Sequence, residues 1–347
     1  MIYYSVFFII FLFSMIEIEN KNLAKIFYIP FIFFLLFFIG FRYEVGGDWG
    51  NYLDMYDSFK ELSLNYESIF KSDIGYSLLN IFSAYLGFED TIFINFISAL
   101  LVCIFLSLTF SKLKMPWVAM LLYYPFHVLI VSLGYTRQSI AAAIMLYAFT
   151  FLLSSDRRKF LLYSILAVLF HKSAMFCLIF IPLSFIGEKR YHLFLYNAFS
   201  LFTIFSIVYY VYHFSEWLYS SSGELQSNGT IVRFSSHFIP IILYFGYRNI
   251  FTKEHSKIMD YFLVLIVVLF ICSFFASTLS DRLNIYLVFF DLFVVIQIFY
   301  NSKFTDKFLL LILFFIFFYV YIYVWLSYGE WSIKAWLPYN NYIMSYF

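Results

Sequence analysis

Residues 160–187 read FLLYSILAVLFHKSAMFCLIFIPLSFIG, an apolar run interrupted near its middle by His171, Lys172 and Ser173. One helix needs about 20 residues to cross the hydrocarbon core of a bilayer, so this run is either one long span or two short helices. The choice decides the topology of the whole chain, because a single span would reverse the orientation of every later loop.

The distribution of basic residues favours two short helices. Cytoplasmic loops near span ends carry an excess of Lys and Arg. With a hairpin at 160–187, 14 of the 22 basic residues face the cytoplasm, whereas a single span moves five of them outside. The 14 are Lys21, Lys25, Lys112, Lys114, Arg157, Arg158, Lys159, Lys189, Arg190, Arg248, Lys253, Lys257, Lys303 and Lys307. We therefore predict a re-entrant hairpin whose tip is FHKS, with both chain ends outside.

The rest of the composition indicates a membrane protein. The chain is 63% hydrophobic and 12% charged, far more apolar than a soluble domain. We predict an all-α integral membrane protein, a polytopic helical bundle of about 10 spans plus the hairpin, in a single domain over residues 1–347. The predicted spans are 2–16, 26–41, 91–111, 116–133, 138–153, 194–213, 237–252, 258–278, 283–299 and 308–327. The predicted outer segments are 42–90, 214–236 and the tail 328–347.

Four outer cations stand at the starts of inward-running helices: Arg137, Lys172, Arg233 and Arg282. A cation is disfavoured at a helix N-terminus, where free N–H groups already make the end positive. An anion bound between converging ends would offset this cost. The alternative for each residue is that it extends to lipid headgroups. The pattern predicts an anion site on the outer side.

The first outer loop, GFRYEVGGDWGNYLDMYDSF at 40–59, concentrates polar groups in one place. Trp49, Leu53 and Tyr56 recur at helical spacing, which predicts an amphipathic helix at the membrane boundary. Residues 74–86 form a second interfacial helix or dip into the bilayer. Asp48 follows Gly46-Gly47 and is either a general base or the N-cap of the helix.

His171 lies at the predicted hairpin tip, and ionisable groups at membrane depth are candidates for function. Its imidazole is either a proton acceptor or a hydrogen-bonded packing group. The six histidines form no i, i+4 pair, so no metal site is expected from them.

Five motifs in order along the chain carry a resemblance. They are FRYEVGGDWGNY (41–52), GYTRQSIAAAI (134–144), LFHKSAMF (169–176), SDRLNIY (280–286) and WLPYNNY (336–342). Together they resemble the EpsG-like family of bacterial polysaccharide polymerases, which includes Wzy-type O-antigen polymerases.

The resemblance implies a GT-C-like glycosyltransferase of the bacterial inner membrane with its active site facing the periplasm. Its substrate would be an undecaprenyl-pyrophosphate-linked oligosaccharide, with no cofactor, no nucleic acid and a chain-length co-polymerase as a partner. By motif, the expected catalytic residues are His171, Asp48 and Arg137. The expected substrate-binding residues are Arg42, Tyr52, Lys172, Ser173, Arg233, Arg282, Tyr286 and Tyr339.

Two other functions use similar substrates. An O-antigen ligase takes the same donor, and the residues alone do not separate it from a polymerase. A flippase or exporter of lipid-linked oligosaccharide should carry ionisable residues near the bilayer midplane. Asp291 is the clearest ionisable residue inside a predicted span, and most polar candidates lie outside, which favours chemistry on one face.

Overall fold

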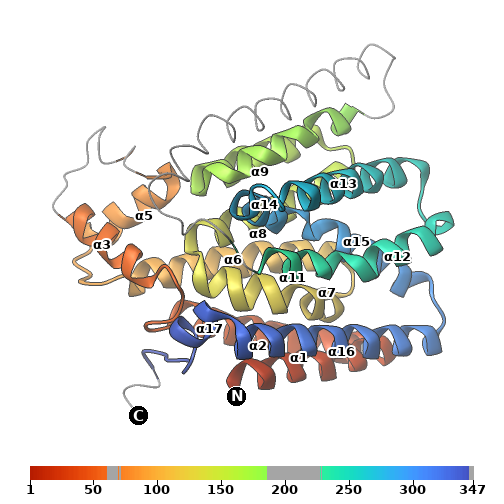
Figure 1. Cartoon of the computed structure of the whole chain (residues 1–347), viewed down its shortest axis with the longest axis horizontal. Helices are drawn as coiled ribbons and strands as arrows, with labels where there is room; N and C mark the ends of the chain where they lie inside the picture. Colours follow the sequence, from red (N-terminus) through yellow and green to blue (C-terminus); the bar gives the residue numbers. More distant parts are fainter. Residues whose placement is uncertain (61–68, 70–71, 186–226, 228, 344–347) are drawn as a thin grey trace. The chain divides into compact units, whose positions relative to one another are not determined.

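The computed structural model describes residues 1–60, 69, 72–185, 227 and 229–343 (Figure 1). Regular structure in these residues is helical, apart from one isolated β-bridge between Arg42 and Asn341. The chain divides into two compact units. The first holds the described residues of Met1–Tyr147, Leu166–Lys172 and Phe299–Phe347, and the second holds those of Ala148–Ile165 and Ser173–Ile298.

Seven helices in the described part of the chain are long and apolar enough to cross a membrane, which confirms the predicted fold class. They are α1 (Ile2–Glu19), α2 (Lys21–Gly40), α6 (Ile92–Leu113), α8 (Thr136–Leu153), α13 (Lys253–Cys272), the continuous run Ser277–Asn301 and α16 (Phe304–Tyr328). The run Ser277–Asn301 comprises α14 (Ser277–Asn284), a short turn of 3₁₀-helix (Ile285–Leu287) and α15 (Val288–Asn301).

The remaining predicted spans differ from the structure in length or lie outside it. The span predicted at 116–133 is a shorter helix, Pro116–Ser132. The span predicted at 237–252 begins earlier and ends earlier, as the apolar helix Thr230–Gly246. The span predicted at 194–213 lies outside the described residues.

In the first unit, α1 packs against both α2 and α16, and the three helices run side by side in Figure 1. The turn between α1 and α2 is made by Asn20, whose side chain accepts a hydrogen bond from the amide of Leu23 at 3.1 Å. This N-cap satisfies one of the amides that a helix start leaves free.

A buried carboxylate from α1 caps a different helix. The Glu17 carboxylate accepts the amides of Trp117 and Val118, at the start of α7 (Pro116–Tyr123). Pro116 occupies the first turn, where a missing N–H costs nothing. This long-range cap fixes α7 against the end of α1.

The next element is a π-helix, Tyr124–Ser132, which leads through Leu133-Gly134-Tyr135 into α8. Such i→i+5 winding is rare and often occurs next to functional residues. The sequence pattern predicts an ordinary α-helical span here, because apolar residues on every face give no signal of the wider turn.

The predicted outer segment, residues 42–90, contains two amphipathic helices in its described part. α3 (Trp49–Lys60) confirms the predicted helix, but it buries Tyr52, Tyr56 and Phe59, whereas Trp49 and Leu53 stay half-buried. α5 (Ile74–Tyr85) packs against α3, through contact of Tyr52 and Tyr56 with Tyr76.

The chain breaks at the predicted hairpin tip. α9 (Arg157–Phe170) ends before His171, and a 3₁₀-helix, Lys172–Phe185, follows. Residues 160–187 are therefore two helical segments in their described part, and not one long helix. The path of these segments across a bilayer stays a prediction.

The second unit includes the continuous helical run α11 (Thr230–Phe234), 3₁₀-helix Ser235–His237 and α12 (Phe238–Gly246). A single 3₁₀ turn, Arg248–Ile250, precedes α13. α11 packs against α13 and α14, and this contact carries the polar network described below. The chain ends with α17 (Glu330–Ala335), which belongs to the first unit.

Candidate active site

Asp73 is the centre of a polar cluster in the first unit. It precedes α5, but its carboxylate makes no cap for that helix. Oδ2 accepts hydrogen bonds from Arg137 Nη1 at 3.0 Å and from His171 Nδ1 at 3.3 Å. Oδ1 accepts the backbone amide of Lys172 at 3.1 Å. One carboxylate therefore joins the starts of α5 and α8 to the hairpin tip.

The surroundings of Asp73 keep it ionised. Burial acts to raise the pKa of this carboxyl, since only 3% of the side chain is exposed. The hydrogen bond and charge of His171, the charge of Arg137 and the Lys172 amide oppose burial, and the net pKa lies below its usual range. Asp73 thus acts as an acceptor only, which selects the His171 tautomer with its proton on Nδ1.

His171 keeps its second ring nitrogen available. Its side chain is 17% exposed, and Nδ1 makes its only hydrogen bond to a described residue, Asp73. Nε2 is then the ring nitrogen left to exchange a proton, and the Asp73 contact holds it in a fixed direction. This is the geometry of an oriented proton acceptor.

Arg137 is held on three sides. Its Nη1 also donates to Ser72 Oγ at 2.9 Å, and its guanidinium carbon lies 5.9 Å from the Tyr52 ring centre and 5.8 Å from the Tyr76 ring centre. These are distances of cation–π contacts. The side chain remains 28% exposed. Burial raises the pKa of Tyr52, and the Arg137 charge opposes that shift, so both groups keep their ordinary neutral-pH forms.

Arg42 lies deeper and is 2% exposed. Nη1 donates to the Ile39 carbonyl at 2.9 Å. Nη2 donates to Asn95 Oδ1 at 3.1 Å and to Thr136 Oγ1 at 2.7 Å. No carboxylate of the described residues pairs with it, and burial lowers its pKa. The guanidinium is fixed by neutral oxygens, so its positive charge is not cancelled by an ion pair.

Other predicted residues of the first unit lie around this cluster. The carbonyl of Asp48 accepts the Tyr52 amide at 3.0 Å, and its carboxylate accepts Asn51 Nδ2 at 3.4 Å. Asp48 therefore stands at the start of α3. Tyr339 donates to the Phe38 carbonyl at 2.7 Å, and burial raises its pKa to about 12. The side chain of Lys172 is exposed.

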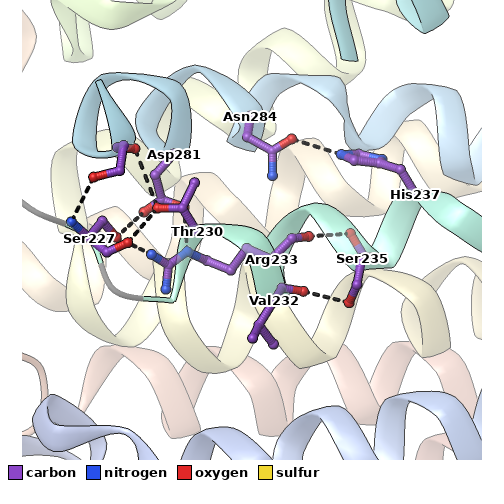
Figure 2. A network of polar contacts seen from close by, with 10 residues as sticks. Ser227, Thr230, Val232, Arg233, Ser235, His237, Asp281 and Asn284 are labelled. Atoms are coloured by element: carbon purple, nitrogen blue, oxygen red, sulfur yellow. Dashed lines mark hydrogen bonds and ion pairs between the residues drawn. The ribbon is translucent and has the colours of Figure 1, made fainter. Parts of the chain in front are cut away.

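Four predicted binding residues belong to the second unit. Ser173 Oγ lies 2.8 Å from the hydroxyl of Tyr286. Arg233 Nε donates to Asp281 and its Nη2 to Ser227, as Figure 2 shows. Arg282 is exposed on α14. The anion that the sequence pattern requires at Arg233 is thus the Asp281 carboxylate.

A second histidine network lies beside this pair (Figure 2). His237 Nδ1 contacts the Asp291 carboxylate at 2.8 Å, and Nε2 contacts Asn284 Oδ1 at 2.8 Å. All three side chains are buried. Both ring nitrogens of His237 are occupied, in contrast to His171.

Asp73 is the central residue of this cluster, and sequence reasoning missed it. Its partners lie 64 and 98 positions away, so no local spacing marks it. The one available signal was an acidic residue at the N-cap position of the apolar helix 74–86. In the described part of the chain, no group of three or more His, Cys, Asp or Glu could hold a metal ion.

Comparisons with known proteins place the chain by its sequence. No curated protein and no solved structure matches it. The EpsG family model matches residues 25–341, nearly the whole chain. The chain therefore belongs to the EpsG family.

Proposed function

We propose that this protein is a polysaccharide polymerase of the O-antigen type. It transfers a growing glycan from undecaprenyl pyrophosphate onto a lipid-linked repeat unit, at the periplasmic face of the bacterial inner membrane. Membership of the EpsG family supports the class of reaction. The observation that carries the proposal is the contact of one carboxylate, Asp73, with both His171 and Arg137.

His171 is the general base in this proposal. The hydroxyl oxygen of the acceptor sugar attacks the anomeric carbon of the donor, and its proton moves to His171 Nε2. The bond from that carbon to the pyrophosphate oxygen breaks, and its electron pair leaves with the lipid pyrophosphate. Asp73 orients the imidazole through Nδ1, and a positioned base typically contributes about 10²–10⁴-fold. A single displacement of this kind inverts the anomeric centre.

Asp48 was the other candidate base. Its backbone carbonyl accepts the Tyr52 amide at the start of α3. We assign the proton transfer to His171, because Asp73 orients its ring.

Arg137 contacts the pyrophosphate in this proposal, and the buried Arg42 attracts it through its charge. Asp73 takes one Nη of Arg137, while no described carboxylate pairs with Arg42. Two guanidinium groups and one carboxylate leave a net positive charge that attracts an anion. Preorganised donors aimed at a leaving pyrophosphate replace the metal that many glycosyltransferases use. Tyr52 and the exposed Lys172 lie at the edge of this site.

Four residues of the second unit are also proposed to bind substrate. Ser173, Tyr286, Arg233 and Arg282 bind sugar or phosphate groups of the lipid-linked oligosaccharide. Arg233 does so as a residue already fixed by Asp281. A chain-length co-polymerase is the proposed protein partner, and no cofactor takes part.

The test uses bacteria that lack this gene, complemented with wild type, Arg137→Ala or Arg248→Ala at matched membrane levels. Arg248 pairs with Asp260 on an exposed surface and serves as the arginine control. Surface polysaccharide is separated on a gel. We expect ladders from wild type and Arg248→Ala, and single repeat units on the lipid core from Arg137→Ala.

Other outcomes contradict the proposal. Loss of all repeats from the lipid core in Arg137→Ala would favour a ligase or a flippase. A full ladder from Arg137→Ala would show that this cluster is not the catalytic site.

A further inference from the structure

The C-terminal segment, residues 330–342, lies along the first outer loop of the same unit. The amide of Gly46 donates to the Ala335 carbonyl at 2.8 Å, and the amide of Tyr43 donates to the Asn340 carbonyl at 3.1 Å. The amide of Tyr342 donates to the Phe41 carbonyl at 2.8 Å. These backbone bonds flank Arg42 on both sides, so the chain end fixes the loop that carries it.

The same segment closes the outer end of α2. A helix end leaves its last carbonyls without partners. Here Tyr339 Oη donates to the Phe38 carbonyl, and Asn341 Nδ2 donates to the Phe37 carbonyl at 3.3 Å. Arg42 itself takes the next carbonyl, that of Ile39. Arg42 and two residues of the C-terminal segment therefore cap the last carbonyls of α2.

Trp336 links this segment to the π-helix and to the turn at Gly134, which precedes α8, the helix that carries Arg137. The indole is buried, and its Nε1 donates to the Leu129 carbonyl in the π-helix at 2.8 Å. Its ring lies against Gly134, where an added Cβ would come within 2.7 Å of Cζ2. An added Cβ at Gly46 would come within 2.3 Å of the Leu133 carbonyl oxygen. The Arg42 loop, the turn at Gly134 and the Trp336 indole are therefore packed so closely that an added methyl group at either glycine would clash.

The contact between Trp336 and Gly134 lies shortly before Arg137 in the sequence. Gly134 precedes Arg137 by three residues, and Thr136 between them accepts the Arg42 hydrogen bond. A shift of the turn would therefore move Arg137 and weaken the support of Arg42 together.

We propose that Trp336 is a positioning residue that sets Arg137 and Arg42 relative to each other. It touches neither arginine and acts through Gly134 and the Arg42 loop. The inference rests on the proposed function, in which Arg137 contacts the pyrophosphate and the charge of Arg42 attracts it.

A matched control separates positioning from general stability. Trp117 is also buried, and its Nε1 donates to a backbone carbonyl, that of Ala24, at the same 2.8 Å. It lies in the first turn of α7, 17 residues before Gly134 in the sequence. Trp336→Phe and Trp117→Phe lose the same kind of hydrogen bond and the same ring volume, so we expect similar falls in melting temperature in detergent.

The two variants should differ in activity. In the deletion strain, at matched membrane levels, Trp336→Phe should reduce the polymer by a factor on the order of 10 to 100, because small misplacements of binding groups are costly. Trp117→Phe should keep at least about half of the wild-type polymer. Equal polymer from the two variants would overturn the inference.

A second pair of variants tests the contact itself and remains informative if Trp336→Phe is poorly expressed. Gly134→Ala places a methyl group against Cζ2 of Trp336 and should reduce the polymer strongly. Phenylalanine lacks that atom, so Gly134→Ala with Trp336→Phe should make more polymer than Gly134→Ala alone. Additive losses would contradict the proposal.

Failure of the proposed function would look different. If Arg137→Ala retains whatever phenotype the wild-type gene restores, the assigned active site is wrong. If Arg137→Ala loses that phenotype while Trp336→Phe matches Trp117→Phe, the positioning role alone is wrong.

Discussion

The two units each combine a histidine, an arginine and aspartate, but they use these residues differently. In the first unit, Asp73 serves both His171 and Arg137, and the histidine keeps one nitrogen open. In the second unit, each cation has its own carboxylate, and both nitrogens of His237 are occupied. The same residue types make an open site in one case and a closed network in the other.

The difference shows where chemistry can take place. A buried polar group with every donor and acceptor satisfied contributes to a specific, rigid packing arrangement. A group held on one side and open on the other can exchange a proton or bind a ligand. This contrast supports the proposed catalytic role of His171 and a structural role for His237, although both contact aspartate.

The largest expected effect is on activity at His171. His171→Gln keeps a polar side chain but removes the base, so polymer formation should fall by about 10²–10⁴-fold. The melting temperature should change little, because the side chain is partly exposed. The rate is measured with purified protein and lipid-linked repeat units, with His255→Gln in the first turn of α13 as the control. A variant with more than half of the wild-type rate would place the base elsewhere.

The reverse pattern is expected at His237. His237→Ala leaves the buried Asp291 without its partner, which typically costs about 3–5 kcal/mol. The protein should unfold at a markedly lower temperature, while the rate per folded molecule stays within a few-fold of wild type. Unfolding in detergent and rate are measured on the same samples. A stable but inactive variant would move His237 into the catalytic machinery.

A smaller effect is expected from Arg42→Lys. Lysine keeps the charge but cannot span the Ile39, Asn95 and Thr136 oxygens with one ammonium group. Loss of a hydrogen bond from a charged group costs about 1.5–3 kcal/mol of folding stability, so the melting temperature should fall, and the displaced charge should weaken the apparent affinity for the lipid-linked donor. Arg248→Lys is the control. Unchanged affinity would remove Arg42 from the anion site.

The smallest expected effect is the pH dependence linked to Asp73. Its pKa is lower in the folded protein than in the unfolded chain, so its ionisation stabilises the fold at every pH above the ordinary value near 4. That contribution is lost as the pH falls through the lowered folded-state pKa. The melting temperatures of wild type and Asp73→Asn should differ at pH 6 and converge as the pH falls through the lowered pKa of Asp73. A constant difference over this range would show that the charge of Asp73 is not what stabilises the fold.

Local patterns predicted the elements better than the site. Apolar composition and length predict the long helices, and the polar FHKS break predicts the helix end at His171. The first loop predicts α3, although the buried face centres on Tyr52 because α5 packs there. The contacts of Asp73 join residues far apart in sequence, and no periodicity encodes them. The π-helix and the bonds of the C-terminal segment to the Arg42 loop also depend on tertiary packing.

The most direct test of the account is a double-mutant cycle on Asp73 and His171. The polymer made by Asp73→Asn, His171→Gln and the double variant is compared at matched membrane levels. If Asp73 acts by orienting the His171 base, each single variant should lose most of the polymer and the double variant should be no worse than the more severe single variant. A double variant whose loss equals the product of the two single losses, or a full ladder from Asp73→Asn, would contradict the assignment.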